Sequence, residues 1–285
     1  MMLSLIMKIT IIFFSILIIW CLLAQSCMKF TVSDATAKKQ FQQKGVEIEL
    51  PTAKVDKRHI HYAKTGNDSF PTIVFIHGTP GSWNAFEDYL ADSELLKHFR
   101  MISIDRPGFG ESDFGEPEHL YRQSELISPL LKQLQNGKPI FIVGHSLGGP
   151  MVIKLAADNP QMFSAIIILA GSNDPAEEKP EKWRPLLFQT PLRFLVPGSF
   201  RPSNEELWYL KKDLVDLKDD FQKITSNVII MHGDKDELVP YSNAAYTQKM
   251  LVNAKHVEMI TFPGENHFIP WIKFTEIKKT LMNLH

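Results

Sequence analysis

The chain has 285 residues, with 31 Lys and Arg against 32 Asp and Glu and a formal net charge of -1. This length can bury a sizeable core, and the near-neutral charge excludes a nucleic-acid binder that works by neutralising phosphates. The 15 Gly and 18 Pro are scattered rather than periodic, which argues against a fibrous or largely disordered chain.

The chain begins with an uncharged apolar run. Residues 9–24 read ITIIFFSILIIWCLLA and follow Lys8. A basic residue before a short apolar run that ends in small residues is typical of a secretory signal peptide. The run is shorter than the ~20 residues that span a bilayer comfortably. The alternative is an uncleaved N-terminal membrane anchor.

Both cysteines lie close to the end of this run, at Cys21 and Cys27. The sequence LAQSC at residues 23–27 resembles the lipobox of bacterial lipoproteins, in which the signal is cut before the cysteine and the cysteine carries lipid. The resemblance implies an exported protein, tethered to a membrane of the bacterial cell envelope through lipid on Cys27. Residues 1–27 are therefore expected to be a signal peptide or anchor. Residues 28–45, which are polar and rich in Lys and Gln, are expected to be a tether.

From residue 46 onward, short β-branched runs alternate with helical stretches. Two runs with polar residues alternating come first, at 46–50 and 57–62, and predict an antiparallel pair. Continuous apolar runs come next, at residues 72–76, 101–105, 140–143, 165–169, 228–231 and 256–261. Continuous apolar strands separated by helices indicate a parallel sheet that is buried on both faces. We therefore expect one α/β domain over residues 46–285, with a mostly parallel eight-stranded sheet between two helical layers.

Residues 172–222 break this alternation, because they hold six prolines among many large apolar side chains. The interval is too long for a simple crossover loop, and its prolines mark boundaries between short helices. We expect a helical cap over the edge of the sheet where the strands have their carboxyl ends, since ligands bind there in such sheets. The alternative is an insertion that packs on the side.

The sequence GHSLG at residues 144–148 directly follows the strand at 140–143 and opens a helix. Small residues on both sides of Ser146 let the backbone turn sharply and expose the hydroxyl at a helix N-terminus, where N–H groups favour developing negative charge. This context predicts that Ser146 is a nucleophile. The alternative is a glycine-bounded turn with a buried serine.

A serine hydroxyl needs a base to take its proton, and the base needs an acid to orient it. His267 comes a short turn after the last predicted strand, which places it at the same edge of the sheet as Ser146. Asp236 comes after the strand at 228–231 and is the expected acid, since the chain order is then Ser, Asp, His, the order typical of α/β-hydrolases. Asp234 is expected to make the turn instead. Asp174, which comes after the strand at 165–169, is the fallback acid.

An oxyanion hole needs two N–H donors beside the nucleophile. The N–H of Leu147, one residue after Ser146, is the first expected donor. The second is expected from the loop HGTPG at residues 77–81, directly after the strand at 72–76. Pro80 has no N–H, so Thr79 is the best candidate and Gly78 the second.

Five motifs, HGTPGS, DRPGFGES, GHSLGG, HGDKDELVP and GENHF, occur in this order at predicted strand ends. Together they resemble the α/β-hydrolase superfamily over roughly residues 46–285. The resemblance implies the α/β-hydrolase fold with a cap insertion, and Ser146, Asp236 and His267 as nucleophile, acid and base. The form of the first motif is similar to that of epoxide hydrolases and haloalkane dehalogenases, but those families carry Asp at the position of Ser146, so their mechanism is not expected.

The sequence therefore predicts a serine hydrolase that cleaves a small, largely apolar carboxylic ester or related acyl compound through an acyl-enzyme. Two alternatives use the same triad, C–C bond hydrolysis and cofactor-free peracid formation; a third is a catalytically silent fold that binds a ligand. No cofactor or metal is expected, because no cluster of His, Cys or carboxylates has ligand spacing. The expected partners are a small ester-like substrate and, through the N-terminus, a membrane, but no nucleic acid. The sequence leaves the oligomeric state open.

Overall fold

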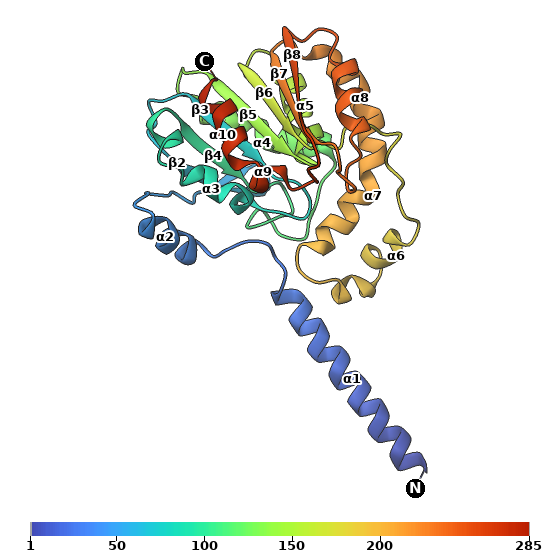
Figure 1. The fold of residues 1–285 in the computed structure, drawn as a ribbon. Helices are drawn as coiled ribbons and strands as arrows, with labels where there is room; N and C mark the ends of the chain where they lie inside the picture. The colour runs from blue at the N-terminus through green and yellow to red at the C-terminus, as the bar shows by residue number, and fades with distance from the viewer. Residues whose placement is uncertain (1, 285) are drawn as a thin grey trace.

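The computed structural model describes residues 2–284. At its centre lies an eight-stranded sheet with the strand order β1-β2-β4-β3-β5-β6-β7-β8 (Figure 1). β1 pairs antiparallel with β2 and β2 antiparallel with β4, whereas every other neighbouring pair is parallel. The expected α/β fold with a mostly parallel eight-stranded sheet is confirmed. The strands are β1 (Thr52–Val55), β2 (Arg58–Thr65), β3 (Thr72–Ile76), β4 (Arg100–Ile104), β5 (Ile140–His145), β6 (Ala165–Leu169), β7 (Asn227–Gly233) and β8 (His256–Phe262).

The first edge strand lies later in the chain than predicted. Residues 46–50 form an isolated bridge between Glu49 and Lys64, and the edge strand is β1. Val55 of β1 pairs with Arg58 of β2, which leaves a two-residue turn between them. Asp56 takes a φ of 56° in that turn, a conformation that Asp tolerates and that short hairpin turns require. The tight hairpin therefore sets the position of the edge strand.

Helices cover both faces of the sheet, and alternate residues along each strand face opposite cores. On one face, Val74 and Ile142 pack in a core with α4, α5 and α8. On the other face, Phe75 and Val143 pack in a second core with α3, α9 and α10. Both faces of the inner parallel strands are thus buried, as the continuous apolar runs predict. The edge strand β8 differs, because of its seven residues only Phe262 is buried. These helices are α3 (Glu87–Leu90), α4 (Leu120–Gln133), α5 (Gly148–Asp158), α8 (Ser242–Met250), α9 (Ile269–Ile272) and α10 (Phe274–Met282).

Residues 172–222, between β6 and β7, are called the cap segment here; they contain one helix of 17 residues and three shorter helices. Leu210 and Leu214 in the C-terminal half of its longest helix are buried in the same core as α5. Phe200 and Leu207, nearer the start of that helix, line a cavity that also contains Ser146. The segment therefore reaches from the body of the domain to the site. Its helices are α6 (Arg184–Phe188), η3 (Pro191–Leu195), α7 (Phe200–Asp216) and η4 (Leu217–Lys223).

The apolar N-terminus forms one long helix, α1 (Met2–Ser26), which projects away from the domain on the side of α6 and α7 (Figure 1). Its C-terminal end is bonded to the cap segment. Trp20 Nε1 donates to Leu195 O at 3.0 Å, and Gly198 N–H donates to Ala24 O at 2.9 Å. The end of the apolar helix is thus held against η3.

A second helix, α2 (Asp34–Gln43), lies within the segment that the sequence predicts as a tether. Its residues Ala37 and Phe41 are buried in the core that also holds Trp83. Part of residues 28–45 therefore packs on the domain, because α2 presents an apolar face to the sheet despite its polar composition.

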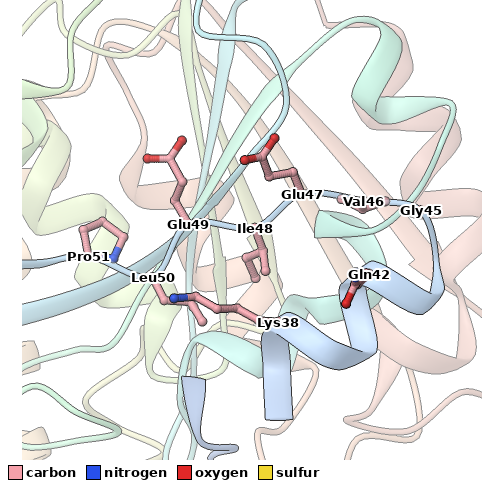
Figure 2. Close-up of a pocket in the computed structure, with 9 residues that line it drawn as sticks. All are labelled: Lys38, Gln42, Gly45, Val46, Glu47, Ile48, Glu49, Leu50 and Pro51. Carbon is pink, nitrogen blue, oxygen red and sulfur yellow. The ribbon is translucent and has the colours of Figure 1, made fainter. Parts of the chain in front are cut away.

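A hollow of about 780 Å³ lies between α2 and residues 45–51 (Figure 2). In Figure 2 the side chains of Glu47 and Glu49 lie on one side of this strand-like stretch and those of Ile48 and Leu50 on the other. The hollow holds none of the predicted site residues. We therefore assign it no part in the chemistry.

The packing of α2 predicts a measurable contribution to stability. Phe41→Ala is expected to lower the free energy of unfolding by about 3 kcal/mol, because it removes a buried aromatic side chain and leaves a cavity. Urea denaturation measures the change, with Gln42→Ala, an exposed neighbour on the same helix, as the matched control. Equal stability of the two variants would show that α2 is a detachable tether.

Candidate active site

Ser146 lies in a sharp turn between β5 and α5. Its φ is 56°, in the left-handed region that non-glycine residues rarely adopt. Its N–H donates to Leu169 O at 2.9 Å, and its carbonyl accepts from Gly149 N–H at 2.8 Å. The turn is thereby fixed to β6 on one side and to α5 on the other. The serine stands at the N-terminal end of α5, where unpaired N–H groups favour a negative charge.

Two glycines make room for this turn. A Cβ on Gly144 would lie 2.2 Å from Gly148 O, and a Cβ on Gly78 would lie 2.7 Å from Ser146 Cβ. Side chains at either position would force the backbone apart. The glycines of the sequence motifs thus bring the start of α5 and the loop after β3 into contact with the serine.

His267 and Asp236 form a buried hydrogen-bonded pair. His267 Nδ1 donates to Asp236 Oδ2 at 2.7 Å, which leaves Nε2 as the proton-accepting nitrogen. Asp236 Oδ1 also accepts from the N–H groups of Leu238 and Val239 at 2.9 and 2.8 Å. Burial alone would raise the pKa of Asp236, but hydrogen bonds from His232, His267 and the Val239 N–H outweigh burial and hold the pKa well below its usual range. Asp236 is therefore an anion that orients the imidazole.

His145, the residue before Ser146, contacts the ring of His267 and hydrogen-bonds to its backbone carbonyl. The two rings lie 4.7 Å apart between centroids, and His145 Nε2 donates to His267 O at 3.1 Å. Complete burial, reinforced by the nearby His267, lowers the pKa of His145 to about 3. A neutral His145 can thus hold the backbone of the loop that carries His267 without adding a charge beside it.

Ser146 and His267 face the same cavity, which has a volume of about 690 Å³. Among residues 2–284 no hydrogen bond joins Ser146 Oγ to His267, and in unliganded enzymes such bonds are often long until substrate binds. Apart from the polar groups around Ser146, the cavity wall is largely apolar. Its apolar residues include Phe30, Phe200, Leu207, Leu210, Leu238, Val239, Phe268 and Trp271.

The loop after β3 is fixed by a buried side-chain network. His77 is fully buried, and its burial, together with the nearby Arg106, holds its pKa well below the usual range. His77 Nδ1 donates to Gly78 O at 2.7 Å, and its Nε2 accepts from Arg106 N–H at 3.0 Å. Arg106 Nη2 also donates to Gly78 O at 3.0 Å. The Gly78 carbonyl is therefore fixed in one direction by two donors.

Arg106 also joins this loop to the cap segment. Its guanidinium is buried and forms a two-point ion pair with Glu206 of α7, in which Nη2 lies 3.0 Å from Oε2. Gln123 of α4 contacts both partners, at 3.1 Å from Arg106 Nη1 and 2.8 Å from Glu206 Oε1. A buried ion pair is strongly destabilised when one partner is lost. The loop after β3 and α7 are therefore held in one arrangement.

The structure separates the candidate acids. Asp236 contacts His267, whereas Asp174 accepts from Ala176 N–H at 2.8 Å in a local turn. Asp234 accepts from Gly264 N–H at 2.7 Å and so ties the turn before His267 to the loop after β7.

The three candidate oxyanion donors are the backbone N–H groups of Leu147, Thr79 and Gly78. None of them donates a hydrogen bond within the described part of the chain, so all three are available to a bound molecule.

Sequence reasoning missed several residues that build the site. His145 is part of the recognised motif, so its position was visible but its support of His267 was not. Phe30, Glu178 and Glu206 come from segments without a motif, and no sequence signal marks them. Within residues 2–284, no group of three or more His, Cys, Asp and Glu side chains is placed to hold a metal ion.

Comparison with known proteins identifies the family. The family model described as "alpha/beta hydrolase fold" matches residues 71–197. The chain is 33% identical over 119 residues to epoxide hydrolase 1 of Caenorhabditis elegans, covering 40% of this chain but 28% of that protein. It is 25% identical over 257 residues to the pimeloyl-[acyl-carrier protein] methyl ester esterase of Nitrosomonas europaea, covering 76% of this chain and 95% of the relative.

A solved structure of a bacterial membrane phospholipase A superposes with a TM-score of 0.63, covering 99% of this chain and 98% of the other at 16% sequence identity. This likeness concerns the fold. The sequence matches, to the family model over residues 71–197 and to the two named relatives, assign the chain to the α/β-hydrolase superfamily of enzymes.

The burial of neutral His145 predicts a pH-dependent stability. The unfolded chain binds a proton on this histidine below a pKa of 6.5, whereas the folded chain does so only near 3. The free energy of unfolding therefore falls as the pH is lowered through this window, by about 3 kcal/mol between about pH 7 and pH 4. In His145→Gln this part of the loss should vanish, while His256→Gln, which changes an exposed histidine, should keep it. Urea denaturation at several pH values measures the difference; parallel curves for wild type and His145→Gln would contradict the assignment.

Proposed function

We propose that this hydrolase is a serine esterase that cleaves a small, largely apolar carboxylic ester, with Ser146 as nucleophile, His267 as base and Asp236 as the residue that orients His267. One observation carries the proposal: a serine in a left-handed turn and a histidine bonded to a buried aspartate line the same cavity. The name of the Nitrosomonas europaea relative, a methyl ester esterase, agrees with ester hydrolysis.

In the proposed reaction His267 Nε2 takes the proton of Ser146 as Oγ attacks the ester carbonyl carbon. The carbonyl π electrons move to oxygen and form a tetrahedral oxyanion. When this intermediate collapses, the C–O bond to the alcohol breaks and His267 gives its proton to the departing alkoxide. Water then attacks the acyl-enzyme with His267 as base again, which releases the acid and restores Ser146.

The oxyanion donors are assigned to the N–H groups of Leu147 and Thr79. In a trans peptide the carbonyl and the following N–H point in opposite directions. Because His77 and Arg106 both bind the Gly78 carbonyl, the Thr79 N–H points away from Arg106. Thr79 and Leu147 both line the cavity with Ser146. This geometry favours Thr79 over Gly78 as the second donor.

The preference for an apolar substrate rests on the cavity wall. Leu207, Leu238 and Phe268 lie in it beside the predicted triad. Burial of substrate methylenes against such a wall contributes about 0.8 kcal/mol each.

A series of p-nitrophenyl esters with graded acyl length locates the preferred substrate. The same triad suits C–C hydrolysis and peracid formation, so a diketone and a mixture of acetate and peroxide belong in the same panel.

The role of Ser146 has a direct test. A fluorophosphonate probe should label the wild-type protein at Ser146, and Ser146→Ala should lose labelling and at least about ten-thousand-fold in kcat/KM, because no other group supplies the attacking oxygen. Ser93→Ala, which changes an exposed serine that does not line the cavity, should behave as wild type. A folded wild-type protein that neither reacts with the probe nor turns over any ester would point instead to a catalytically silent binding protein.

We further propose that α1 attaches the enzyme to a membrane. Leu5–Gln25 are 21 residues, long and apolar enough to cross a bilayer; their most apolar 18-residue stretch has a mean hydropathy of 2.6, and none of that stretch is buried against the domain. A secretory signal peptide can have the same length and composition. Removal of a signal peptide, however, would leave a mature chain without the contacts between this helix and the cap segment. Cleavage before Cys27 would remove Trp20, Ala24 and Gln25, which bond to the cap segment. These contacts favour a retained helix over lipid on Cys27.

One experiment distinguishes a retained helix from a lipidated Cys27. The full chain carrying Cys27→Ala should remain in the membrane fraction with an intact mass that includes residues 1–26, because the anchor is then the helix itself. Release into the soluble fraction, or a wild-type mass that lacks these residues and carries lipid, would establish the lipoprotein route.

A further inference from the structure

One carboxyl group in the wall of the cavity has no part in the proposed reaction. Glu178 of the cap segment lines the cavity together with Ser146 and Ser172. Ser172 Oγ donates to Glu178 Oε1 at 2.6 Å. The Ser172 N–H in turn donates to Ser146 O at 3.2 Å. The carboxyl is thus bonded to the residue that contacts the backbone of the proposed nucleophile.

Glu178 is half-buried in the wall of the cavity, and its carboxyl group has no ion-pair partner among the described residues. In the described chain, no Lys, Arg or His lies within ion-pair distance of its carboxyl group, and Oε2 accepts no hydrogen bond. The two nearby cations are engaged elsewhere. Lys211 donates to the backbone carbonyl of Glu178 at 2.9 Å, and Arg184 pairs with Glu181 at 2.6 Å.

An uncompensated carboxyl in an apolar wall lowers stability. Burial raises the pKa of Glu178 despite the hydrogen bond from Ser172. Leu207 and Leu210 of α7 face the same space, so an apolar residue at position 178 would suit the wall better. A hydrogen-bond donor on a bound molecule would offset this cost by satisfying Oε2.

We propose that Ser172 and Glu178 form a polar subsite that binds a hydroxyl group on the substrate, so that the preferred substrates are esters bearing a hydroxyl on an otherwise apolar chain. The proposal rests on the esterase function given above and narrows its substrate class. The hydroxyl donates to Glu178 Oε2, while the ester carbonyl lies at Ser146.

A hydroxyl fits this subsite better than an ammonium group. Transferring an ammonium ion from water into a cavity with apolar walls costs several kcal/mol, far more than a hydroxyl. Among residues 2–284, Glu178 is the carboxyl that lines the cavity, and the charge of the nearby Glu181 is already paired with Arg184. Glutamine at position 178 would retain an acceptor for a hydroxyl but would remove the charge that an ammonium needs.

The test compares p-nitrophenyl esters of ω-hydroxyalkanoic acids, over a range of chain lengths, with isosteres in which a methyl or an ammonium group replaces the hydroxyl. At one chain length the full-length wild type should prefer the hydroxyl ester over the methyl ester by about tenfold in kcat/KM, the value of one hydrogen bond to a buried group. Glu178→Leu should abolish this preference, so that the ratio of kcat/KM for the hydroxyl and methyl esters falls to about one. Glu178→Gln should retain most of it.

Glu177→Leu is the matched control, because Glu177 is the neighbouring carboxylate, bonds to Ser242 and does not line the cavity. Thermal unfolding of each variant confirms that it is folded. A wild type without hydroxyl preference at any length, a preference that survives in Glu178→Leu, or a preference for the ammonium ester would each overturn the subsite and leave the esterase intact. A wild type that hydrolyses none of these esters and resists the fluorophosphonate would overturn both proposals.

Discussion

Ser146 holds a left-handed backbone conformation between β5 and α5, and the glycines at positions 78 and 144 permit it because a Cβ at either would collide with the turn. The exposure of the hydroxyl and its place at a helix N-terminus both depend on that geometry. The same close contact at Gly78 fixes how far the loop after β3 lies from the serine. The arrangement of the remaining groups can therefore be described relative to this one turn.

Around the turn, the buried charged groups of Arg106 and Asp236 are each held by several partners. Arg106 binds the Gly78 carbonyl on one side and Glu206 on the other, so it fixes the loop after β3 and α7 together. Asp236 is stabilised in the same way, with two backbone N–H groups and His267 around one carboxylate. Glu178 differs from both, since the Ser172 hydroxyl binds one of its oxygens and no group in the described chain binds the other.

The sequence was informative where function depends on local backbone. The strand-turn-helix at Ser146, the parallel sheet and the position of Asp236 after β7 could be predicted because short motifs determine them. The edge strand was misplaced because a two-residue hairpin turn at Asp56 outweighed a β-branched run. Glu206 and Phe30 could not be predicted, because they reach the site only through the packing of the cap segment and of residues 24–30, called the N-terminal arm here, and neither segment has a motif.

The N-terminal arm forms hydrogen bonds with the rest of the domain at several successive residues. Ala24 bonds to Gly198, Ser199 N–H donates to Met28 O at 2.9 Å, and Ser82 Oγ donates to Phe30 O at 2.7 Å. Phe30 then lines the cavity and packs edge-on against Phe200. A protein that lacks residues 1–30 would therefore lose Phe30 from the wall of the cavity together with the apolar helix α1, and its kinetics would describe a cavity of different shape.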